Sequence, residues 1–583
     1  MNGFNNYSNY NEMKLYHRII LLFLILFFIC FNRWGINWGI PSEERTELVF
    51  PVQLHNESFY LLMKQAREEI YKQSMGSPIG RLRDSSSLSP VLKSIGIIGN
   101  ENLYFNGDKK ILANFIRPYL LRSNHPDEQM TIASLAGMHP KQFDFNPRIF
   151  QYGGAYIYVM GAWLGMHHIL GVIKLSSDLN FYFRNPGTMG KIFVAGRSIN
   201  SVFCALTIFL IFIIAKITYS VRAAIFSSLF FIVCPAIVFQ SHIMKPYPMA
   251  TFFAFACLYY SVIMMSDSTK KNYILAGVFA GLTAGTMPVY AFIMLAPLTA
   301  HMSISKRLTK NLLFTVLAGT LIFFITNPYW LINYKDIFLE VKTSADIYNL
   351  KSGIVVSDFF LKRLLLSLPT GLLFISLAGL IHGIYLGKKQ DILFILTSMI
   401  PLLIFGWIIK NQQLTIHNSR FLLPWLATLL ILAAGFIDNL LDKKYVTIPV
   451  VVFTVFAVTQ ALLISSIYNK NFSIDGSVNS TRVAAGKWIS DNIPFNSTIG
   501  TNYMPEPAHF PPFDFSKYRI VVLRNDIEKN LPGYFVTVNA RYRDNINYQL
   551  IKSFKPIDSI GIFKFNAGMS GANSLVNIYK FKA

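Results

Sequence analysis

SVFCALTIFLIFIIAK, residues 201–216, is a continuous apolar run that ends in a lysine. Together with residues 198–200 it approaches the ~20 residues that an α-helix needs to cross the ~30 Å hydrocarbon core of a bilayer. Its apolar residues do not alternate with polar ones, which excludes a strand of a transmembrane β-barrel. Similar runs recur along the chain, so most of this protein is predicted to lie in lipid.

The composition of the 583-residue chain agrees with this prediction. Hydrophobic residues make up 53% of it and charged residues only 14%, whereas about a quarter of an ordinary soluble protein is charged. The formal net charge is +23. An excess of this size is typical of nucleic-acid binding unless the basic residues serve another purpose, so their positions along the chain decide between the two.

About eleven membrane spans are predicted. The first covers residues 19–32, after a cytoplasmic N-terminus at 1–18, and the absence of a small-residue cleavage site favours an uncleaved anchor over a signal peptide. The run 273–304 is too long for one span and short for two, and Pro288 is expected to break it. With that division, the bundle occupies residues 198–467, with spans at 198–216, 223–241, 249–266, 273–288, 289–304, 312–328, 364–386, 391–409, 421–440 and 446–467.

The short loops set the orientation. Alternate connections carry pairs or triplets of basic residues, and the positive-inside rule places these on the cytoplasmic side. With about eleven spans they share the side of the N-terminus, and residue 583 lies outside. The run Tyr156 to Val172 would reverse this order if it crossed, so we expect it to lie in the outer interface. The basic loops contain Lys216 and Arg222, Lys270 and Lys271, Lys306 to Lys310, Lys388 and Lys389, and Lys443 and Lys444.

Two polar blocks are then exterior. Residues 33–197 form a large first loop, and residues 468–583 are predicted to form a small α/β domain with a helix at 483–489. Strands are expected at 518–523, 533–538, 560–565 and 576–581. Neither block contains cysteine, because Cys30, Cys204, Cys234 and Cys257 all lie in predicted spans. No disulfide framework is therefore expected outside the membrane.

The adjacent carboxylates Asp127 and Glu128 are the leading catalytic candidates. They precede an aromatic stretch that begins at Phe145 and contains Tyr152. A carboxylate near the membrane interface can act as a general base or bind a cation beside a phosphate leaving group. The alternative is that both acids only begin a helix, where negative charge is favoured. A rival acidic cluster at Glu43, Glu44 and Glu47 is better explained as a solvated helix start.

Cations near the predicted outer surface form a second set. Arg197 opens a span, His242 and Lys245 lie in the second exterior loop, and Arg420 precedes a further span. Ionisable groups at membrane depth are usually paired or functional, and the planar fork of arginine suits a lipid-linked phosphate. The alternative is that these side chains extend toward the headgroups. No nucleotide-binding fingerprint and no zinc-type spacing is present.

These motifs, taken in order, resemble the GT-C superfamily of polytopic glycosyltransferases, in particular the branch related to aminoarabinose transferase and protein O-mannosyltransferases. The likeness runs through most of the chain. It is carried by Asp127-Glu128, the stretch Tyr152 to Trp163, Gly196-Arg197-Ser-Ile-Asn, Pro235 with Ser241-His242, Ala276 to Leu282, Asn327-Pro328-Tyr329 and Arg420-Phe-Leu-Leu-Pro424.

The resemblance implies an integral-membrane hexosyl- or pentosyltransferase of the bacterial inner membrane, with its site on the periplasmic face. Its donor would be a polyprenyl-phosphate sugar, and its acceptor a glycan, lipid or protein. Asp127 would activate the acceptor for inversion at the anomeric carbon, and Glu128 would orient it. Arg420, Lys245 and Arg197 would neutralise the donor phosphate. His242, Tyr247 and Tyr152 complete the expected substrate-binding set.

Two departures from the family pattern concern metal and phosphate binding. Many relatives carry an acid in the second exterior loop, where Tyr247 stands in this chain, which weakens the case for a divalent cation. No cofactor is therefore assigned, and a divalent cation remains open. Many relatives also carry a lysine after the glycine-containing span, where Thr286-Met287-Pro288 stands here.

The main rival is a transporter or flippase of lipid-linked saccharides, and a membrane scaffold is a second. No inverted repeat supports the transporter, and a scaffold would not need Asp127 and Glu128. The basic excess divides between the cytoplasmic loops and the exterior blocks, which face an anionic membrane. The partners expected are therefore the bilayer and a lipid-linked phosphate, with no nucleic acid.

Overall fold

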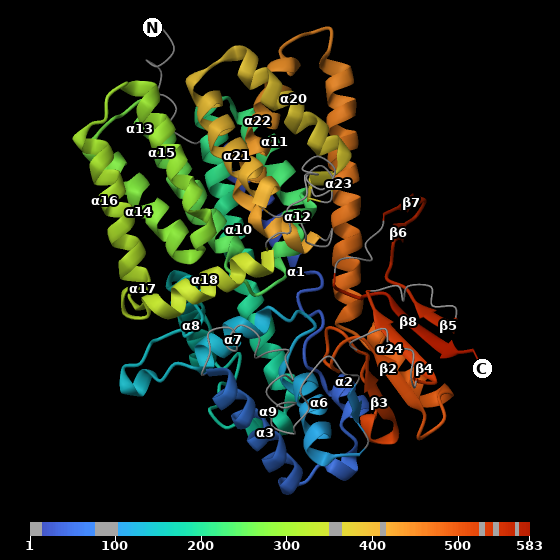
Figure 1. Ribbon diagram of the computed structural model, residues 1–583. Helices are drawn as coiled ribbons and strands as arrows, with labels where there is room; N and C mark the ends of the chain where they lie inside the picture. Colours follow the sequence, from blue (N-terminus) through green and yellow to red (C-terminus); the bar gives the residue numbers. More distant parts are fainter. Residues whose placement is uncertain are drawn as a thin grey trace. The chain divides into compact units, whose positions relative to one another are not determined.

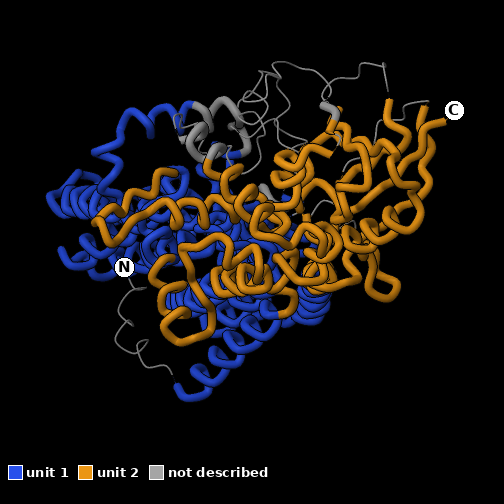
Figure 2. Tube along the Cα trace, turned by 90° about the horizontal axis from the view of Figure 1, so that it is seen from below, with its two compact units in different colours: residues 1–33, 150–160, 198–466 blue, residues 34–149, 161–197, 467–583 orange. Residues whose placement is uncertain are grey.

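The computed structural model describes residues 14–75, 103–105, 107–348, 364–365, 367–408, 416–523, 531–539, 547–565 and 571–582. The chain forms two compact units, coloured separately in Figure 2. Unit 1 comprises residues 1–33, 150–160 and 198–466, and unit 2 comprises residues 34–149, 161–197 and 467–583. Each unit is thus assembled from segments that are far apart in the sequence. The Asn-rich start at residues 1–13 lies outside the described residues.

Unit 1 is helical. Figure 1 shows α13 to α16 side by side, and the contacts among these helices agree. Two helices, α8 and α10, begin in one unit and end in the other, and α23 extends beyond unit 1 at its end. The elements are α1 (Leu15–Arg33), α8 (Gly154–Ile169), α10 (Pro186–Thr218), α11 (Val221–Val233), α12 (Pro235–Ser241), α13 (Tyr247–Met264), α14 (Lys270–Thr286), η4 (Pro288–Met294), α15 (Leu295–Ile304), α16 (Lys310–Thr326), α17 (Tyr329–Ile332), α18 (Tyr334–Tyr348), α20 (Thr370–Leu386), α21 (Lys389–Ile408), η5 (Ile416–Phe421), α22 (Leu423–Leu441) and α23 (Thr447–Asp475).

Within the described part of the chain, α1, α10, α13, α22 and α23 are long and apolar enough to cross a membrane. The pair α11 and α12, bent by 57° at Cys234, makes a sixth if it is one span. Shorter apolar helices cover 288–304, 310–326 and 370–386. Helices thus occupy every predicted apolar run, while the count of about eleven spans stays a prediction. Helix α10 contains the predicted span 198–216 and extends beyond it toward the N-terminus, back to Pro186.

The predicted break at Pro288 is confirmed. Helix α14 ends at Thr286 and the 3₁₀ helix η4 begins at Pro288. Glycines let α14 approach α16 closely: a Cβ on Gly277 would lie 2.2 Å from the carbonyl oxygen of Thr315, and one on Gly281 would lie 2.4 Å from that of Gly319. Small residues four apart are typical of tightly packed membrane helices.

Unit 2 packs helices against a mixed sheet of order β1-β3-β2-β4-β8-β5. The central strand β2 runs parallel to β3 and β4, whereas β1 and β8 are antiparallel to their neighbours. The two polar blocks therefore share one sheet, because β1 comes from the first block. The helices are α2 (Glu43–Val49), α3 (Glu57–Met75), α6 (Lys109–Leu121), α7 (Glu128–Ala136), α9 (Leu179–Arg184) and α24 (Thr481–Asn492), with the short 3₁₀ helices η2 (Val52–Leu54), η3 (Pro140–Gln142) and η6 (Phe515–Lys517). The strands are β1 (Leu103–Phe105), β2 (Thr498–Thr501), β3 (Arg519–Val522), β4 (Tyr534–Val538), β5 (Tyr548–Phe554), β6 (Ser559–Ile560), β7 (Phe563–Lys564) and β8 (Val576–Phe581).

Most of the expected local structure of the second block is confirmed, including the helix at 483–489 and the strands at 518–523, 533–538 and 576–581. The single strand expected at 560–565 is wrong. Gly561 adopts a φ of +58°, a left-handed conformation that glycine tolerates, and the chain turns there into the hairpin β6–β7. Strand β5 was not predicted; its register with β8 shifts between Leu550 and Lys552.

An apolar core joins α6, α24 and the sheet of unit 2. Phe115, Tyr119, Ile489 and Phe510 are all buried in it, and the Tyr119 hydroxyl donates to the carbonyl oxygen of Phe510 at 2.9 Å. This core fixes the segment that ends α6, from which the chain leads directly into the loop before Asp127.

Candidate functional site

Asp127 and Glu128 lie at the start of α7 but differ in environment. Glu128 is the first helical residue and is fully buried. Asp127 occupies the N-cap position, where its side chain makes no capping hydrogen bond, and it is half-buried. Both acids thus begin a helix, as the alternative expects, and Asp127 differs from Glu128 in being half-buried and making no capping hydrogen bond.

Glu128 forms a buried ion pair with Arg197. Arg197 donates from Nε to Oε1 at 2.8 Å and from Nη2 to Oε2 at 2.7 Å. Both side chains are 0% exposed, and the Ser123 hydroxyl donates to Oε2 at 2.5 Å. This bidentate arrangement is the strongest geometry available to the two groups. It holds α7 and the start of α10 at one point of unit 2.

Arg197 has further partners in the segment after α1. Its Nη1 donates to the carbonyl oxygens of Ile36 at 2.8 Å and Trp38 at 2.7 Å. The guanidinium carbon lies 4.9 Å from the centre of the Trp38 ring, within cation–π range. Four of its five N–H groups are thus used inside the protein. These contacts favour a positioning role for Arg197 over direct phosphate binding.

The rival acids are accounted for by α2. Ser42 caps this helix by accepting from the amide of Arg45, and Glu43 and Glu44 lie in its first turn. Both glutamates are exposed. The interpretation of this cluster as a solvated helix start is confirmed.

In unit 1, two of the predicted cations lie against a group of buried aromatic rings. The Lys245 ammonium is 5.6 Å from the centre of the Tyr247 ring. The Arg420 guanidinium carbon is 5.0 Å from the Phe421 ring, and the two rings are 6.2 Å apart. Tyr290 packs on Tyr247 at 6.3 Å and donates its hydroxyl hydrogen to the carbonyl oxygen of Arg420. The structure therefore brings Lys245, Tyr247 and Arg420 into one cluster.

His242 and Tyr152 are both buried and contact neighbouring parts of the fold. His242 is buried, and its Nδ1 lies 2.7 Å from the carbonyl oxygen of Val238 at the end of α12. Tyr152 is buried and packs edge-on against Tyr156 at 6.1 Å. Both remain predicted substrate-binding residues, with contacts that also explain them as parts of the fold.

The backbone of the aromatic stretch is held by two buried side chains that the motifs did not single out for this purpose. Glu340 accepts from the amides of Phe150 at 3.0 Å and Gln151 at 2.6 Å. Asn327 accepts from the amide of Gly154 at 2.7 Å. This contact gives the Asn327-Pro328-Tyr329 motif a structural role. Nothing in the sequence around Glu340 pointed to it, since its partners are backbone amides 189 and 190 residues away.

The predicted site residues divide between the two units. Asp127, Glu128 and Arg197 belong to unit 2, and the remaining five belong to unit 1. Their convergence on one substrate stays a prediction.

The segment from His242 to Tyr247, predicted as the second exterior loop, offers a divalent metal no carboxylate. A metal ligand must bring a lone pair, whereas Lys245 brings an ammonium that would repel a cation at this position. Within the described residues, no group of three or more His, Cys, Asp or Glu side chains is arranged to hold a metal ion.

Residues 189–330 match the family model described as dolichyl-phosphate-mannose-protein mannosyltransferase. The match confirms the predicted resemblance to the protein O-mannosyltransferase branch over this stretch, which runs from α10 to α17. Together with the apolar helices, it identifies an integral membrane protein. A search of curated proteins gives no match.

Solved structures of membrane glycosyltransferases also align with the chain. ArnT from Cupriavidus metallidurans bound to undecaprenyl phosphate is 13% identical, with a TM-score of 0.41 over 64% of this chain and 69% of its own. The apo oligosaccharyltransferase of Archaeoglobus fulgidus is 11% identical, with a TM-score of 0.38 over 59% of this chain. The chain spans about half the length of that enzyme, 51%.

Proposed function

We propose that this protein is a membrane glycosyltransferase that moves a sugar from a polyprenyl-phosphate donor to a hydroxyl or amine of a glycan, lipid or protein acceptor. The match of residues 189–330 supports the donor class, because that family is described by its dolichyl-phosphate-mannose donor. The observation that carries the catalytic assignment is the environment of Asp127. Asp127 is half-buried at the start of α7, while the neighbouring Glu128 is fully buried and paired with Arg197.

Asp127 acts as the general base in this proposal. It takes the proton from the acceptor hydroxyl or amine while the acceptor oxygen or nitrogen attacks the anomeric carbon. The bond from that carbon to the donor phosphate breaks, and its electron pair leaves on the phosphate oxygen. Attack from the face opposite the phosphate inverts the anomeric centre.

Glu128 and Arg197 are positioning residues rather than reacting groups. Their bidentate bonds and the two carbonyl contacts of Arg197 fix the first turn of α7, on which Asp127 lies. A reacting group held in place by packed neighbours avoids the entropy of finding its geometry at each turnover. The arrangement thus supports a pre-organised base.

Lys245 and Arg420 stabilise the leaving phosphate. Negative charge grows on the phosphate oxygens as the glycosidic bond breaks, and fixed cations in a water-poor site stabilise that charge more than water does. The aromatic rings of Tyr247 and Phe421 hold these two cations at 5.6 Å and 5.0 Å. The site lies on the exterior, periplasmic face in this proposal, because the basic short loops are assigned to the cytoplasm.

The test uses the donor that the cell itself supplies. Cells that lack the protein should accumulate a lipid-linked sugar, which mass spectrometry identifies. The full chain, reconstituted in nanodiscs with that lipid and a membrane extract as acceptor, should release polyprenyl phosphate. A protein that moves the intact lipid between leaflets of a vesicle, with no polyprenyl phosphate released, would instead be the transporter.

A further inference from the structure

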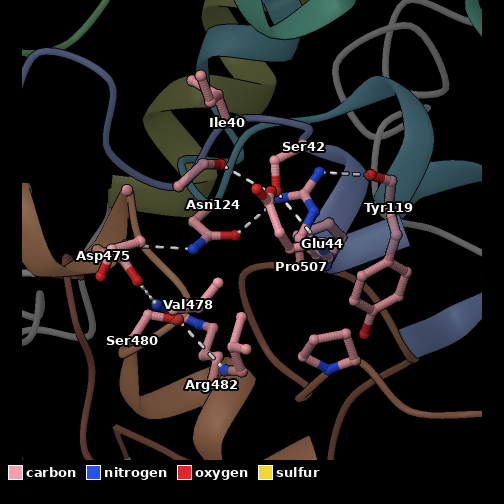
Figure 3. Close-up of a pocket in the computed structure, with 16 residues that line it drawn as sticks. Ile40, Ser42, Glu44, Tyr119, Asn124, Asp475, Val478, Ser480, Arg482 and Pro507 are labelled. Carbon is pink, nitrogen blue, oxygen red and sulfur yellow. Dashed lines mark hydrogen bonds and ion pairs between the residues drawn. The ribbon is translucent and has the colours of Figure 1, made fainter. Parts of the chain in front are cut away.

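Unit 2 contains a cavity of about 90 Å³, lined by both polar and apolar groups, that the proposed reaction does not use (Figure 3). Its walls come from the segment at 39–45, the end of α6 with the loop after it, the turn from α23 into α24, and the proline-rich loop at 507–512. The polar side chains that matter most are Arg45, Asn124, Asp475, Ser480 and Arg482.

Arg45 is a buried cation with one unused donor. It is 5% exposed. Its Nη1 donates to the carbonyl oxygen of Gly39 and to Oδ1 of Asn124, both at 3.2 Å, and its Nη2 donates to the carbonyl oxygens of Tyr119 and Arg122. Its Nε finds no acceptor among the described residues. A buried donor without a partner is costly and calls for an explanation.

Arg482, on another wall of the cavity, is a second buried cation with an unused donor. It is 3% exposed. Its Nη1 contacts Oδ1 of Asp475 at 3.4 Å, and its Nη2 donates to the hydroxyl of Ser574 at 2.8 Å and to the carbonyl oxygens of Ala508 and Gly571. Within the part of the chain that the structure describes, its Nε also has no acceptor. Two buried guanidinium groups that line one cavity thus each keep an N–H unsatisfied.

The buried walls carry more positive than negative charge. Two guanidinium groups face one buried carboxylate, Asp475, which Asn124 also contacts at 3.1 Å. The N-terminus of the twelve-residue helix α24, with Ser480 and Val483, adds to the lining, and a helix N-terminus favours anions. Burial lowers the pKa of the Arg45 guanidinium to about 9 despite Tyr119 and Asp475, and the like charge of Arg482 contributes to that lowering.

The cavity is large enough for a small anionic group and opens to solvent. Its volume of about 90 Å³ leaves room for a phosphate or carboxylate group in place of ordered water. Glu44, Ser477 and Val478 line the cavity and are exposed, so they mark its mouth. The charge of Glu44 is screened by water there, whereas the charges of the two buried arginines are screened much less.

We propose that this cavity binds a compact oxyanion, a phosphate or carboxylate group, between Arg45 and Arg482. Asn124 bonds Arg45 and Asp475 and lies three residues before Asp127, so an anion here also stabilises the loop that carries the proposed base. The anion comes either from solution or from a substituent of the acceptor. Only the second source rests on the proposed function.

The test measures thermal unfolding of the full chain in a maltoside micelle, which contains no phosphate. Inorganic phosphate and acetate are titrated at constant ionic strength with sodium chloride. We expect a saturable rise in the melting temperature. Val478→Trp, which blocks the mouth without touching a buried hydrogen bond, and Arg482→Lys should each raise the apparent Kd at least tenfold. Lys517→Gln removes a half-exposed cation of unit 2 and should leave the Kd unchanged.

Two results would overturn the proposal: no saturable effect of either anion on the unaltered chain, or an unchanged Kd in Val478→Trp. Because this assay needs no turnover, its outcome is independent of the proposed reaction. The two sources of the anion are then distinguished by adding phosphate to the assay of polyprenyl phosphate release. Inhibition of the unaltered chain but not of Val478→Trp indicates competition with an acceptor group, and unchanged or faster turnover indicates an anion from solution.

Discussion

Replacing Glu128 by glutamine removes one charge from an ion pair in which both side chains are fully buried. Arg197 then loses the carboxylate that accepts from its Nε and Nη2. It keeps its bonds to the carbonyl oxygens of Ile36 and Trp38, so it stays buried as an uncompensated cation. Breaking a buried pair in this way destabilises a protein by about 3–5 kcal/mol.

The structure favours the lower end of that range. A glutamine fits the same space, its amide oxygen can still accept from Arg197 Nε, and the Ser123 hydroxyl can reverse to accept from the new amide nitrogen. One contact becomes repulsive, since the amide nitrogen of the glutamine faces Arg197 Nη2. We therefore expect Glu128→Gln to lower the free energy of unfolding by about 3 kcal/mol.

A double-mutant cycle separates the pair from its surroundings. Glu128→Gln combined with Arg197→Met removes both charges and should recover part of the loss, because no uncompensated charge stays buried. Unfolding of the full chain by SDS in mixed micelles can be followed by tryptophan fluorescence, since Trp38 stacks on Arg197. A Glu128→Gln variant within 1 kcal/mol of the unaltered chain, or a double variant as unstable as the sum of the two single ones, would refute the reasoning.

Three further predictions concern unit 1. Lys245→Met keeps the volume of the side chain but removes its charge, and should lower kcat about 10²–10³-fold, whereas Tyr247→Phe keeps the ring and should leave kcat within a few-fold. Gly277→Ala places a methyl 2.2 Å from the carbonyl oxygen of Thr315 and should lower the unfolding free energy by about 1–3 kcal/mol, while Gly165→Ala, with no atom within 4 Å of the new Cβ, should be neutral or stabilising. Asn327→Ala leaves the buried amide of Gly154 unpaired and should lower the unfolding free energy by about 1–3 kcal/mol. An equal effect of Asn311→Ala, a half-buried asparagine of α16, would contradict that assignment.

The helices of unit 1 could be predicted because an apolar run of about 20 residues has few other solutions in lipid. Their ends could not. Helix α10 extends back to Pro186, through polar residues such as Lys191 where hydropathy gives no signal. The break at Pro288 was predictable, since a proline lacks the N–H that would bond to the preceding helical turn and its ring clashes with that turn.

Contacts between residues far apart in the chain could not be predicted from the sequence. Glu128 and Arg197 are 69 residues apart, and no periodicity links them, so both were expected to meet substrate rather than each other. Strand β1 pairs with β3 across more than 400 residues, Leu103 with Val522, which joins the two polar blocks in one sheet. The cavity between Arg45 and Arg482 was missed for the same reason, because its walls come from four separate segments.

The central claim is that Asp127 is the base of a sugar transfer from a polyprenyl-phosphate donor. The most direct measurement is the rate at which the full chain in nanodiscs releases polyprenyl phosphate from the accumulated donor, compared between Asp127→Asn and Asp491→Asn. Asp491 is an exposed carboxylate on α24 and serves as the matched control. We predict a loss of about 10²–10⁴-fold for Asp127→Asn and an ordinary rate for Asp491→Asn. An ordinary rate in a stably folded Asp127→Asn variant would contradict it.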